Sequence, residues 1–566
     1  MPATKSLTYY LYLGISISIA FYYGFWFYYF VSLQEYIVQD DVRQHIVWLQ
    51  RFVDPQLFTN DIIAKYFYNL APLGFKSLYI WMARIGIEPL LLAKLLPPVL
   101  GLITTIYTYL FVWQILPIPL AGCLSGLFLN QLMWLNDDLV SATHRAFIYP
   151  LFAAFLYYLA KKWIIPCLIV MLLQGLFYPH ILLIEMTVLS LRLLVVKEKW
   201  LVKLTHNKQA YVWWIAGIIT TAIALYPITQ KPLELSTTVT AAQMQLMPEF
   251  NLGGRNAFFG GGFWRYWLAG SSGLSLPLFP TVVWLGLALP WLLKTKLPKV
   301  KLFTNKINIL VQVTIASIIM FCLAHILLPK LHLPSRYTYH TLRFMLAIST
   351  GIVLTVCLDV IKKYLNHKKQ FDLSKKIKLT IIAGMSIAII VFPAVPHVFT
   401  NWFQNWKIGT VPEIYRYLAQ QPKDIIVASL NEEANNIPAF SQRSILVGRE
   451  FAMAYHPSYH AQIEQRTVDL LQAQYSLDPQ VVRSFIEKYG VDYWLLESDA
   501  FTPEYIAKQD WLINSSWADT TKAIIEQLAT NSYDVWQELE SSCSVVSTQN
   551  LYLLDSKCIL QSFSVE

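Results

Sequence analysis

Residues 8–41 read TYYLYLGISISIAFYYGFWFYYFVSLQEYIVQDD, and this stretch decides the fold. Residues 8–32 form an apolar run without a charged side chain. A helix needs about 20 such residues to cross a bilayer. Two adjacent carboxylates, Asp40 and Asp41, follow in the next loop. The stretch therefore predicts a membrane-spanning helix that leads into an acidic loop.

The composition of the whole chain agrees with this prediction. Hydrophobic residues make up 55% of the chain and charged residues only 14%, against about 25% charged residues in soluble domains. The net charge is +9, but the basic residues gather in short loops between apolar runs. That distribution is typical of the cytoplasmic loops of membrane proteins rather than of a nucleic-acid-binding surface. We expect a multi-pass membrane protein in contact with lipids, with no nucleic-acid partner.

About eleven apolar runs are candidate membrane spans. They are residues 8–32, 90–114, 117–135, 146–160, 163–178, 179–196, 210–229, 276–294, 307–328, 341–360 and 378–398. Lysines cluster in four of the loops between them, at residues 161–162, 197–208, 294–306 and 362–378. We expect these four loops to be cytoplasmic, because short cytoplasmic loops are rich in lysine and arginine.

Residues 72–88 are ambiguous, because the segment is apolar but contains Lys76 and Arg84. If it crosses the bilayer, a lysine-rich loop moves outside and loop 131–145 moves inside. If it lies along the interface as an amphipathic helix, all four lysine-rich loops are cytoplasmic. We therefore predict about eleven spans in a plasma membrane of bacterial type, with a cytoplasmic N-terminus and an extracytoplasmic C-terminus.

Asp40 and Asp41 are the first candidate catalytic residues. Adjacent carboxylates beside a bilayer are costly unless they serve a function. Such a pair can bind a divalent cation, or one carboxylate can take a proton from an attacking hydroxyl. The structural alternative, a helix N-terminus that favours acidic residues, stays open.

Loop 131–145 repeats the pattern in the sequence QLMWLNDDLVSATHR. Asp137 and Asp138 form a second acidic site, which His144 and Arg145 follow. Capping and anchoring at the interface are again the alternative. We expect any metal to be Mg²⁺ or Mn²⁺, with Asp40 and Asp137 as its candidate ligands.

Cationic side chains follow in later outer loops. Arginine, tyrosine and histidine at a membrane surface suit a phosphate or pyrophosphate group, and they also suit ordinary lipid headgroups. The glycine-rich stretch at residues 251–267, NLGGRNAFFGGGFWRYW, resembles either a lid or a plain interfacial loop. The candidate phosphate-binding residues are Arg336, His340, Arg343, Arg145 and Arg255.

From about residue 399 the pattern becomes that of a soluble domain. Helix and strand signals alternate, which predicts a small α/β domain over residues 399–566 after a transmembrane region over residues 1–398. The predicted helices are 411–421, 459–475 and 478–490, and the predicted strands are 424–430, 444–447, 491–496, 545–547 and 551–554. Cys543 and Cys558 bracket the last two strands. A disulfide is expected in an oxidising compartment, and a reduced pair is the alternative.

This organisation resembles the GT-C class of integral-membrane glycosyltransferases. The class includes the protein O-mannosyltransferases, the oligosaccharyltransferases and the lipid A aminoarabinose transferases. The resemblance rests on Gln39-Asp40-Asp41-Val42-Arg43 after the first span, on Ala71-Pro72-Leu73-Gly74 in the long outer loop 33–89, and on Asn136-Asp137-Asp138. The Trp-Trp-Asp signature of oligosaccharyltransferases does not occur in residues 399–566.

The resemblance implies a mostly helical protein that moves a sugar from a polyprenyl-phosphate donor to an acceptor at the cell envelope, with inversion at the anomeric carbon. Asp40 or Asp41 would activate the acceptor hydroxyl, and the cations named above would stabilise the departing phosphate. The sugar and the acceptor, whether glycan, lipid or protein, stay open. A transporter or flippase of lipid-linked precursors and a non-enzymatic assembly protein are the alternatives.

Overall fold

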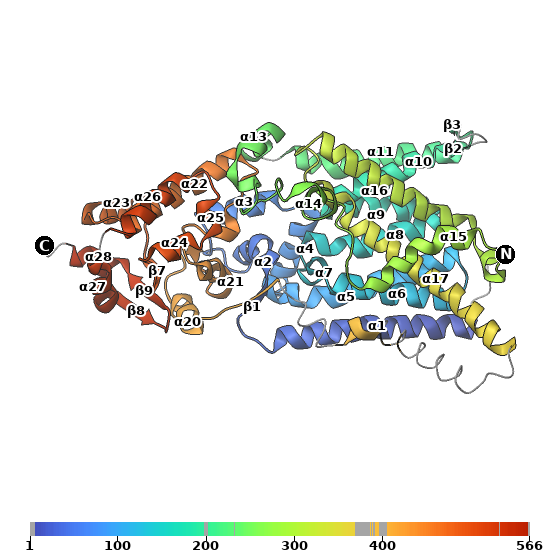
Figure 1. The fold of residues 1–566 in the computed structure, drawn as a ribbon, viewed down its shortest axis with the longest axis horizontal. Coiled ribbons are helices and arrows are strands. Elements are labelled where there is room, and N and C mark those ends of the chain that lie inside the picture. The colour runs from blue at the N-terminus through green and yellow to red at the C-terminus, as the bar shows by residue number, and fades with distance from the viewer. Residues whose placement is uncertain are drawn as a thin grey trace.

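A bundle of long helices carries an α/β region at one of its ends (Figure 1). The structure is a computed structural model. It describes residues 6–196, 202–230, 232–367, 405–530 and 533–563, together with residues 385, 388 and 391–395. The α/β region comprises residues 405–563 and follows the bundle in the chain.

Within the residues that the structure describes, five helices are long and apolar enough to cross a membrane. They are α1 (Leu7–Ser32), α5 (Pro89–Ile115), α11 (Lys208–Thr229), the helix Asn305–Ile326 that contains α16 (Asn308–Ile326), and the helix Pro334–Tyr364 that includes most of α17 (Tyr339–His367). Each coincides with a predicted span. The protein is therefore a multi-pass membrane protein.

Shorter helices occupy five further predicted spans. They are α6 (Pro119–Trp134), α8 (Ile148–Lys161), α9 (Ile164–Phe177), α10 (Pro179–Leu191), and the 3-10 helix η5 (Thr281–Ala288) that continues into α15 (Leu289–Leu293). The predicted span 378–398 lies largely outside the described residues. The predicted number of spans thus stays a prediction.

The ambiguous segment 72–88 forms the short helix α4 (Leu73–Arg84). Its 12 residues would extend about 18 Å at 1.5 Å per residue, well short of the roughly 30 Å hydrocarbon core. Its C-terminus is followed by Gly86, which has a φ of +90°. The short length, together with Lys76 and Arg84, fits an interfacial helix better than a span.

The loops that were predicted to be outside gather at one end of the bundle, next to the α/β region. Helices α2 (Asp40–His45), α7 (Asp137–Val140) and α14 (Gly262–Leu268) mark three of them in the middle of Figure 1. A hairpin of β2 (Leu194–Val196) and β3 (Val202–Leu204), which lies in a lysine-rich loop, is at the opposite end with the N-terminus. Both acidic pairs therefore share one end of the bundle.

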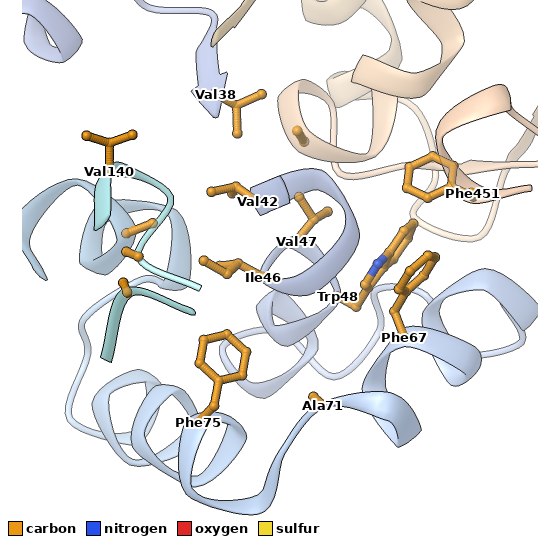
Figure 2. Close-up of a cluster of buried hydrophobic side chains, with 14 of the residues drawn as sticks. Val38, Val42, Ile46, Val47, Trp48, Phe67, Ala71, Phe75, Val140 and Phe451 are labelled. Atoms are coloured by element: carbon orange, nitrogen blue, oxygen red, sulfur yellow. The ribbon is translucent and has the colours of Figure 1, made fainter. Parts of the chain in front are cut away.

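The first loop is wedged between the bundle and the α/β region. Strand β1 (Ile37–Gln39) pairs antiparallel with β4 (Trp406–Ile408), so the chain returns to the first loop immediately before the α/β region. Below this pair, Val42 and Trp48 belong to a buried apolar cluster (Figure 2). The Trp48 ring centroid lies 5.4 Å from that of Phe451 in the α/β region. Burial of this apolar surface fixes the first loop against both parts.

The α/β region is built on a five-stranded sheet in the order β6-β5-β7-β9-β8. Strands β5, β6 and β7 are parallel, and β9 runs antiparallel to both β7 and β8. The five strands are β5 (Ile426–Ala428), β6 (Ser444–Ile445), β7 (Tyr493–Glu497), β8 (Ser544–Ser547) and β9 (Leu551–Asp555). All five match predicted strands, although β5 and β6 are shorter than expected.

Three predicted helices also occur in this region. They are α20 (Pro412–Gln420), α22 (Pro457–Gln474) and α23 (Pro479–Tyr489). Helix α23 begins where the Asp478 carboxylate accepts a hydrogen bond from the Gln480 amide at 2.8 Å, and it ends at Gly490, which has a left-handed φ of +62°. Cys543 and Cys558 form a disulfide with their Cα atoms 5.5 Å apart.

Candidate active site

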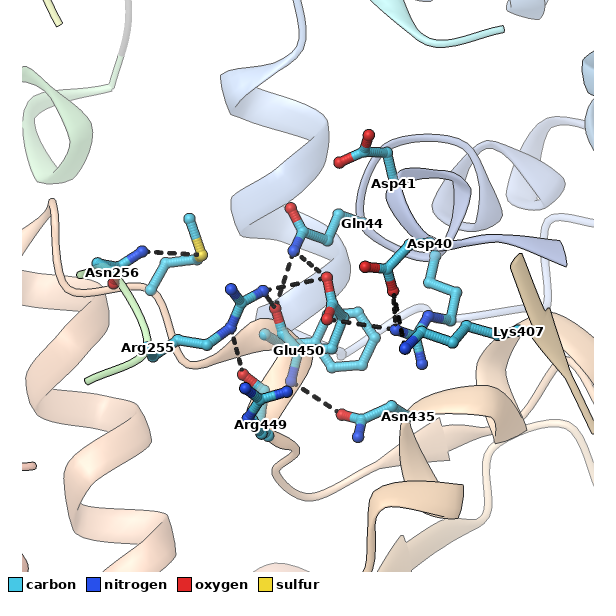
Figure 3. A network of polar contacts seen from close by, with 12 residues as sticks. Asp40, Asp41, Gln44, Arg255, Asn256, Lys407, Asn435, Arg449 and Glu450 are labelled. Atoms are coloured by element: carbon cyan, nitrogen blue, oxygen red, sulfur yellow. Dashed lines mark hydrogen bonds and ion pairs between the residues drawn. The ribbon is translucent and has the colours of Figure 1, made fainter. Parts of the chain in front are cut away.

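The first acidic pair begins helix α2, but neither aspartate caps it. The cap is Gln39, whose side-chain Oε1 accepts a hydrogen bond from the Asp41 amide at 2.8 Å. Consecutive residues on a helix do not face each other, so the carboxylates of Asp40 and Asp41 point in different directions. Figure 3 shows Asp41 turned away from the contacts that Asp40 makes. The two aspartates therefore have separate surroundings.

Asp40 belongs to a network that binds the first loop to the α/β region. Its carboxylate pairs with Arg43 and lies 4.0 Å from the Lys407 ammonium. Arg43 also lies 3.2 Å from Glu450 Oε2, and it donates to Asn436 Oδ1 at 2.9 Å. Two cations, one of them shared with Glu450, therefore lie beside the Asp40 carboxylate.

Glu450 is the centre of that network (Figure 3). It is buried, and its carboxylate contacts Arg43, Gln44 and Arg255. Burial raises the pKa of Glu450, and the positive charges of Arg255 and Arg43 oppose that rise. Because the three contacting side chains come from residues 43–44 and from residue 255, one carboxylate joins two bundle loops to the α/β region.

Arg255 was predicted among the phosphate-binding cations, but the structure places it in the Glu450 network instead. Its Nε donates to the Arg449 carbonyl at 2.8 Å and its Nη2 to the Glu450 carbonyl at 2.9 Å. The same side chain lies 3.1 Å from Glu450 Oε1. These contacts bind Arg255, and with it the glycine-rich loop, to residues 449 and 450 of the α/β region.

Asp41 has a different set of partners, which come from the second acidic loop and from α17. Arg145 donates to Asp41 Oδ2, and Arg145 Nη1 lies 3.3 Å from Asp138 Oδ1. Asp138 Oδ2 in turn lies 3.6 Å from His340 Nδ1. We call Asp41, Arg145, Asp138 and His340 the Asp41 row. Both Asp138 and His340 are 1% exposed, whereas Asp41 is 21% exposed, so the row opens at Asp41.

Asn136 fixes the second acidic loop to α17. Its Oδ1 accepts hydrogen bonds from the Tyr339 hydroxyl at 2.9 Å and from Arg343 Nη1 at 2.7 Å. The Arg343 guanidinium also lies over the Tyr339 ring, 3.5 Å from its centroid. Arg343, another predicted phosphate ligand, is thus engaged in holding the loop. The side chain of Asp137 lies outside what the structure describes.

Arg336 acts electrostatically on the residues around the Asp41 row. Burial and then the charge of Arg336 lower the pKa of Arg145 to about 10. The same two causes, in the same order, lower the pKa of His45 to about 4. Burial, His45 and Arg336 also lower the pKa of His144. Two predicted cations, Arg336 and Arg145, therefore lie close enough to interact in one site. The lowered pKa values make the imidazoles of His45 and His144 neutral at pH 7.

Histidine and tyrosine rings form a continuous row beside these cations. The ring centroids of His45 and His144 are 4.8 Å apart, and those of His144 and Tyr178 are 5.7 Å apart. Tyr178 lies 5.0 Å from His180, which lies 5.4 Å from His332. Of this set, only His144 was predicted as a site residue. His45 could have been found from its place one helical turn after Asp41, whereas the others meet only in the folded protein.

Of the two predicted metal ligands, Asp40 and Asp137, only the side chain of Asp40 lies within the described part of the structure. Asp40 pairs with Arg43 and faces the Glu450 network rather than the second acidic loop. Among the described residues, no group of three or more His, Cys, Asp or Glu side chains has an arrangement that could hold a metal ion. Asp41 and Asp138 approach each other, with the Arg145 guanidinium between them. Binding of Mg²⁺ or Mn²⁺ stays a prediction.

Comparisons with solved structures find proteins of similar fold at low sequence identity. No protein-family profile and no curated protein matches this chain. The oligosaccharyltransferase of Archaeoglobus fulgidus, in a structure tethered to an acceptor peptide, aligns at 12% identity over 91% of this chain and 72% of that chain, with a TM-score of 0.49. The same archaeal enzyme has been solved with an inhibitory peptide and a dolichol-phosphate. ArnT of Cupriavidus metallidurans aligns at 12% identity over 96% of this chain and 97% of that chain, with a TM-score of 0.45.

Proposed function

We propose that this chain is a membrane glycosyltransferase that moves a sugar from a polyprenyl-phosphate donor to an acceptor on the extracytoplasmic face. The observation that carries the proposal is the Asp41 row. It brings a partly exposed carboxylate from the first loop to a cation of the second loop, and Arg336 acts electrostatically on that cation. A base beside positive charge is what displacement of a phosphate leaving group requires.

Asp41 is the candidate base of the reaction. The acceptor oxygen would attack the anomeric carbon while its proton passes to the Asp41 carboxylate. A bond forms between the acceptor oxygen and the anomeric carbon, and the bond from that carbon to the phosphate oxygen breaks with its electron pair. A single displacement of this kind inverts the anomeric configuration. Asp40 is assigned a positioning role, because its pairing with Arg43 joins it to the Glu450 network rather than to the cations of the Asp41 row.

The departing polyprenyl phosphate would be stabilised by Arg336 and Arg145. Preorganised charges at a leaving group are often the largest contribution to catalysis. His45 and His144 are neutral at pH 7, because their pKa values are lowered by burial and by nearby positive charge. A neutral imidazole can donate an N–H to phosphate. Of the five predicted cations, Arg336 and Arg145 are assigned to the phosphate. Arg255 is held by Glu450 and Arg343 by Asn136, and His340 lies at the buried end of the Asp41 row beside Asp138.

The disulfide supports an extracytoplasmic α/β region. Disulfides form and persist in oxidising compartments and are rare in the cytosol. Cys543 and Cys558 form one in this region, which lies at the same end of the bundle as the two acidic loops (Figure 1). We therefore propose that the Asp41 row faces the extracytoplasmic side of a plasma membrane of bacterial type.

The test is sugar transfer by the purified full-length protein and its Asp41→Asn variant. A radiolabelled polyprenyl-phosphate sugar serves as donor and a cell-envelope extract as the source of acceptor. Loss of a general base lowers rates by roughly 10²–10⁴-fold, so transfer by the variant should nearly vanish. The matched control is Asp54→Asn, because Asp54 lies in the same loop but pairs with Lys423 at 2.5 Å, away from the row. Full transfer by a folded Asp41→Asn protein would exclude Asp41 as the base.

A further inference from the structure

A cavity of about 280 Å³ lies directly behind the first acidic pair. It is enclosed by the end of the first loop, the beginning of α5, strand β4 and a short segment of the α/β region. Small-molecule sites typically measure roughly 300–1,000 Å³, so this space suits a group of about the size of one sugar or phosphate-bearing headgroup. Its most informative lining residues are Tyr36, Gln39, Lys94, Val140, Trp406 and Phe440.

Gln39 brings an unsatisfied hydrogen-bond donor to this cavity. Its Oε1 accepts from the Asp41 amide, and because a backbone N–H can only donate, this bond fixes which end of the side-chain amide is oxygen. The other end, Nε2, is therefore an N–H₂ group. It has no hydrogen-bond partner among the described residues, and Gln39 is only 1% exposed. A buried donor without a partner costs free energy. A ligand that accepts this hydrogen bond would remove that cost.

Lys94 brings a positive charge to the cavity. It lies in the second turn of α5 and is half-buried. Neither a hydrogen bond nor an ion pair joins it to any residue that the structure describes. The only carboxylate in the lining, that of Glu35, pairs with Arg416 at 3.4 Å. The cavity thus offers an ammonium and an amide N–H₂ to whatever enters it.

The cavity also adjoins the Asp41 row. Gln39 and Val42 both line it, and they bracket Asp40 and Asp41 in the sequence. Val140, another lining residue, stands two positions after Asp138. A ligand in the cavity would therefore lie against both acidic segments.

We propose that this cavity binds an oxyanion of the acceptor, a phosphate or a carboxylate, through Lys94 and Gln39 Nε2. The lining contains two hydrogen-bond donors and no unpaired carboxylate that could occupy them. Such a site favours a ligand with a negatively charged oxygen. The aromatic rings of Tyr36, Trp406 and Phe440 provide the apolar wall on which the rest of the ligand packs. Naming the ligand as the acceptor rests on the proposed function, whereas oxyanion binding does not.

The test measures how fast Lys94 reacts with an amine-selective reagent in the purified full-length protein in detergent. Peptide mass spectrometry quantifies the modification at each lysine. The probes are inorganic phosphate, acetate and glucose, each at matched ionic strength with chloride as reference. Lys76 is the internal control, because it is also half-buried but lies over the Tyr68 ring, 4.7 Å from its centroid, and outside the cavity lining. Phosphate or acetate should slow labelling of Lys94 and leave labelling of Lys76 unchanged.

A variant then separates oxyanion binding from simple screening by salt. Gln39→Glu keeps the oxygen that caps α2 and replaces the N–H₂ donor by a carboxylate oxygen. Losing a hydrogen bond to a charged group weakens binding by about 10- to 100-fold, so the concentration that protects Lys94 should rise by at least that factor. Arg84→Met, which removes one positive charge from the exposed end of α4, should leave protection unchanged.

Each outcome decides the inference. Protection by phosphate alone identifies a phosphoryl group, and protection by acetate alone identifies a carboxylate. Protection by glucose only, no protection, or equal protection in Gln39→Glu overturns oxyanion binding. These readouts use no sugar transfer. Loss of transfer in Lys94→Met, with donor binding intact, would connect the cavity to the acceptor, and intact transfer would remove the acceptor assignment. Failure of Asp41→Asn to affect transfer would instead refute the proposed function.

Discussion

Arg145 donates a hydrogen bond to the carboxylate of Asp41, a residue that lies 104 positions earlier in the chain. Its other terminal nitrogen lies 3.3 Å from Asp138. A single guanidinium therefore joins the first acidic pair to the second. This contact is the reason that the two acidic loops form one site rather than two.

Replacing Arg145 should damage catalysis more than folding. Arg145→Gln leaves the Asp41 and Asp138 carboxylates without the charge between them, and it removes one of the two cations assigned to the donor phosphate. Loss of one preorganised donor typically costs about 10²–10³-fold in rate. We expect kcat to fall by that factor in the sugar-transfer assay.

Arg145→Lys distinguishes charge from geometry. An ammonium keeps the positive charge, but it lacks the planar fork that contacts two carboxylates at once. We expect this variant to recover only a small part of the lost rate. Wild-type kcat in Arg145→Lys would show that a positive charge alone suffices at this position.

Glu450 should be a major source of stability at the junction between the bundle and the α/β region. Glu450→Ala leaves the Arg43 and Arg255 guanidiniums without their shared carboxylate, and breaking a buried ion pair costs about 3–5 kcal/mol. The variant should unfold at a markedly lower temperature in a thermal melt. Glu432→Ala is the control, since its partner Arg449 and its own side chain are exposed, at 42% and 67%. That change should cost less than about 1 kcal/mol, and equal effects from the two variants would contradict the central role of Glu450.

His45 should make the protein less stable in mild acid. Burial, followed by the charge of Arg336, lowers its pKa from 6.5 to about 4, so the native imidazole stays neutral where the unfolded chain takes up a proton. The unfolded state then binds more protons between pH 6.5 and about 4, and stability falls as the pH falls through this window. His144 contributes in the same direction.

The measurement is the apparent melting temperature between pH 7 and pH 5. His45→Gln cannot take up the proton, so the decline of its melting temperature toward pH 5 should be shallower than that of the wild type. His206→Gln, at an exposed position, should follow the wild-type curve. A variant curve parallel to the wild type would show that His45 does not titrate in this way.

The disulfide should stabilise the end of the α/β region. Cys543 and Cys558 are separated by 15 positions, and closing a loop of that size removes roughly 3 kcal/mol of chain entropy from the unfolded state. The double variant Cys543→Ser/Cys558→Ser should expose residues of β8 and β9 to proteolysis at lower temperature. Cys322→Ser, which replaces an exposed free cysteine, should not. Protection of β8 and β9 that is unchanged by the double variant would show that packing alone holds this hairpin.

The sequence predicted the long helices well, because an uninterrupted apolar run has few other folds available in a lipid environment. It also predicted the strands of the α/β region and the ends of α23, since Asp478 and Gly490 are local signals. It predicted five phosphate-binding residues, however, and the structure places Arg145 and His340 in the Asp41 row with Arg336 acting on it. Arg255 and Arg343 have their contacts with Glu450 and Asn136 instead. The sequence gives the charge of a loop arginine, but the group with which that arginine pairs depends on the folded structure.

What the sequence by itself determined is the membrane bundle and the presence of two acidic loops, because both follow from runs of neighbouring residues. Only the tertiary structure decided that Asp41, and not Asp40, meets Arg145. The two aspartates are adjacent in the chain, but a helix turns consecutive side chains in different directions. One therefore faces Glu450 in the α/β region and the other faces the second acidic loop. Which carboxylate belongs to the site depends on packing between segments that lie more than 100 positions apart.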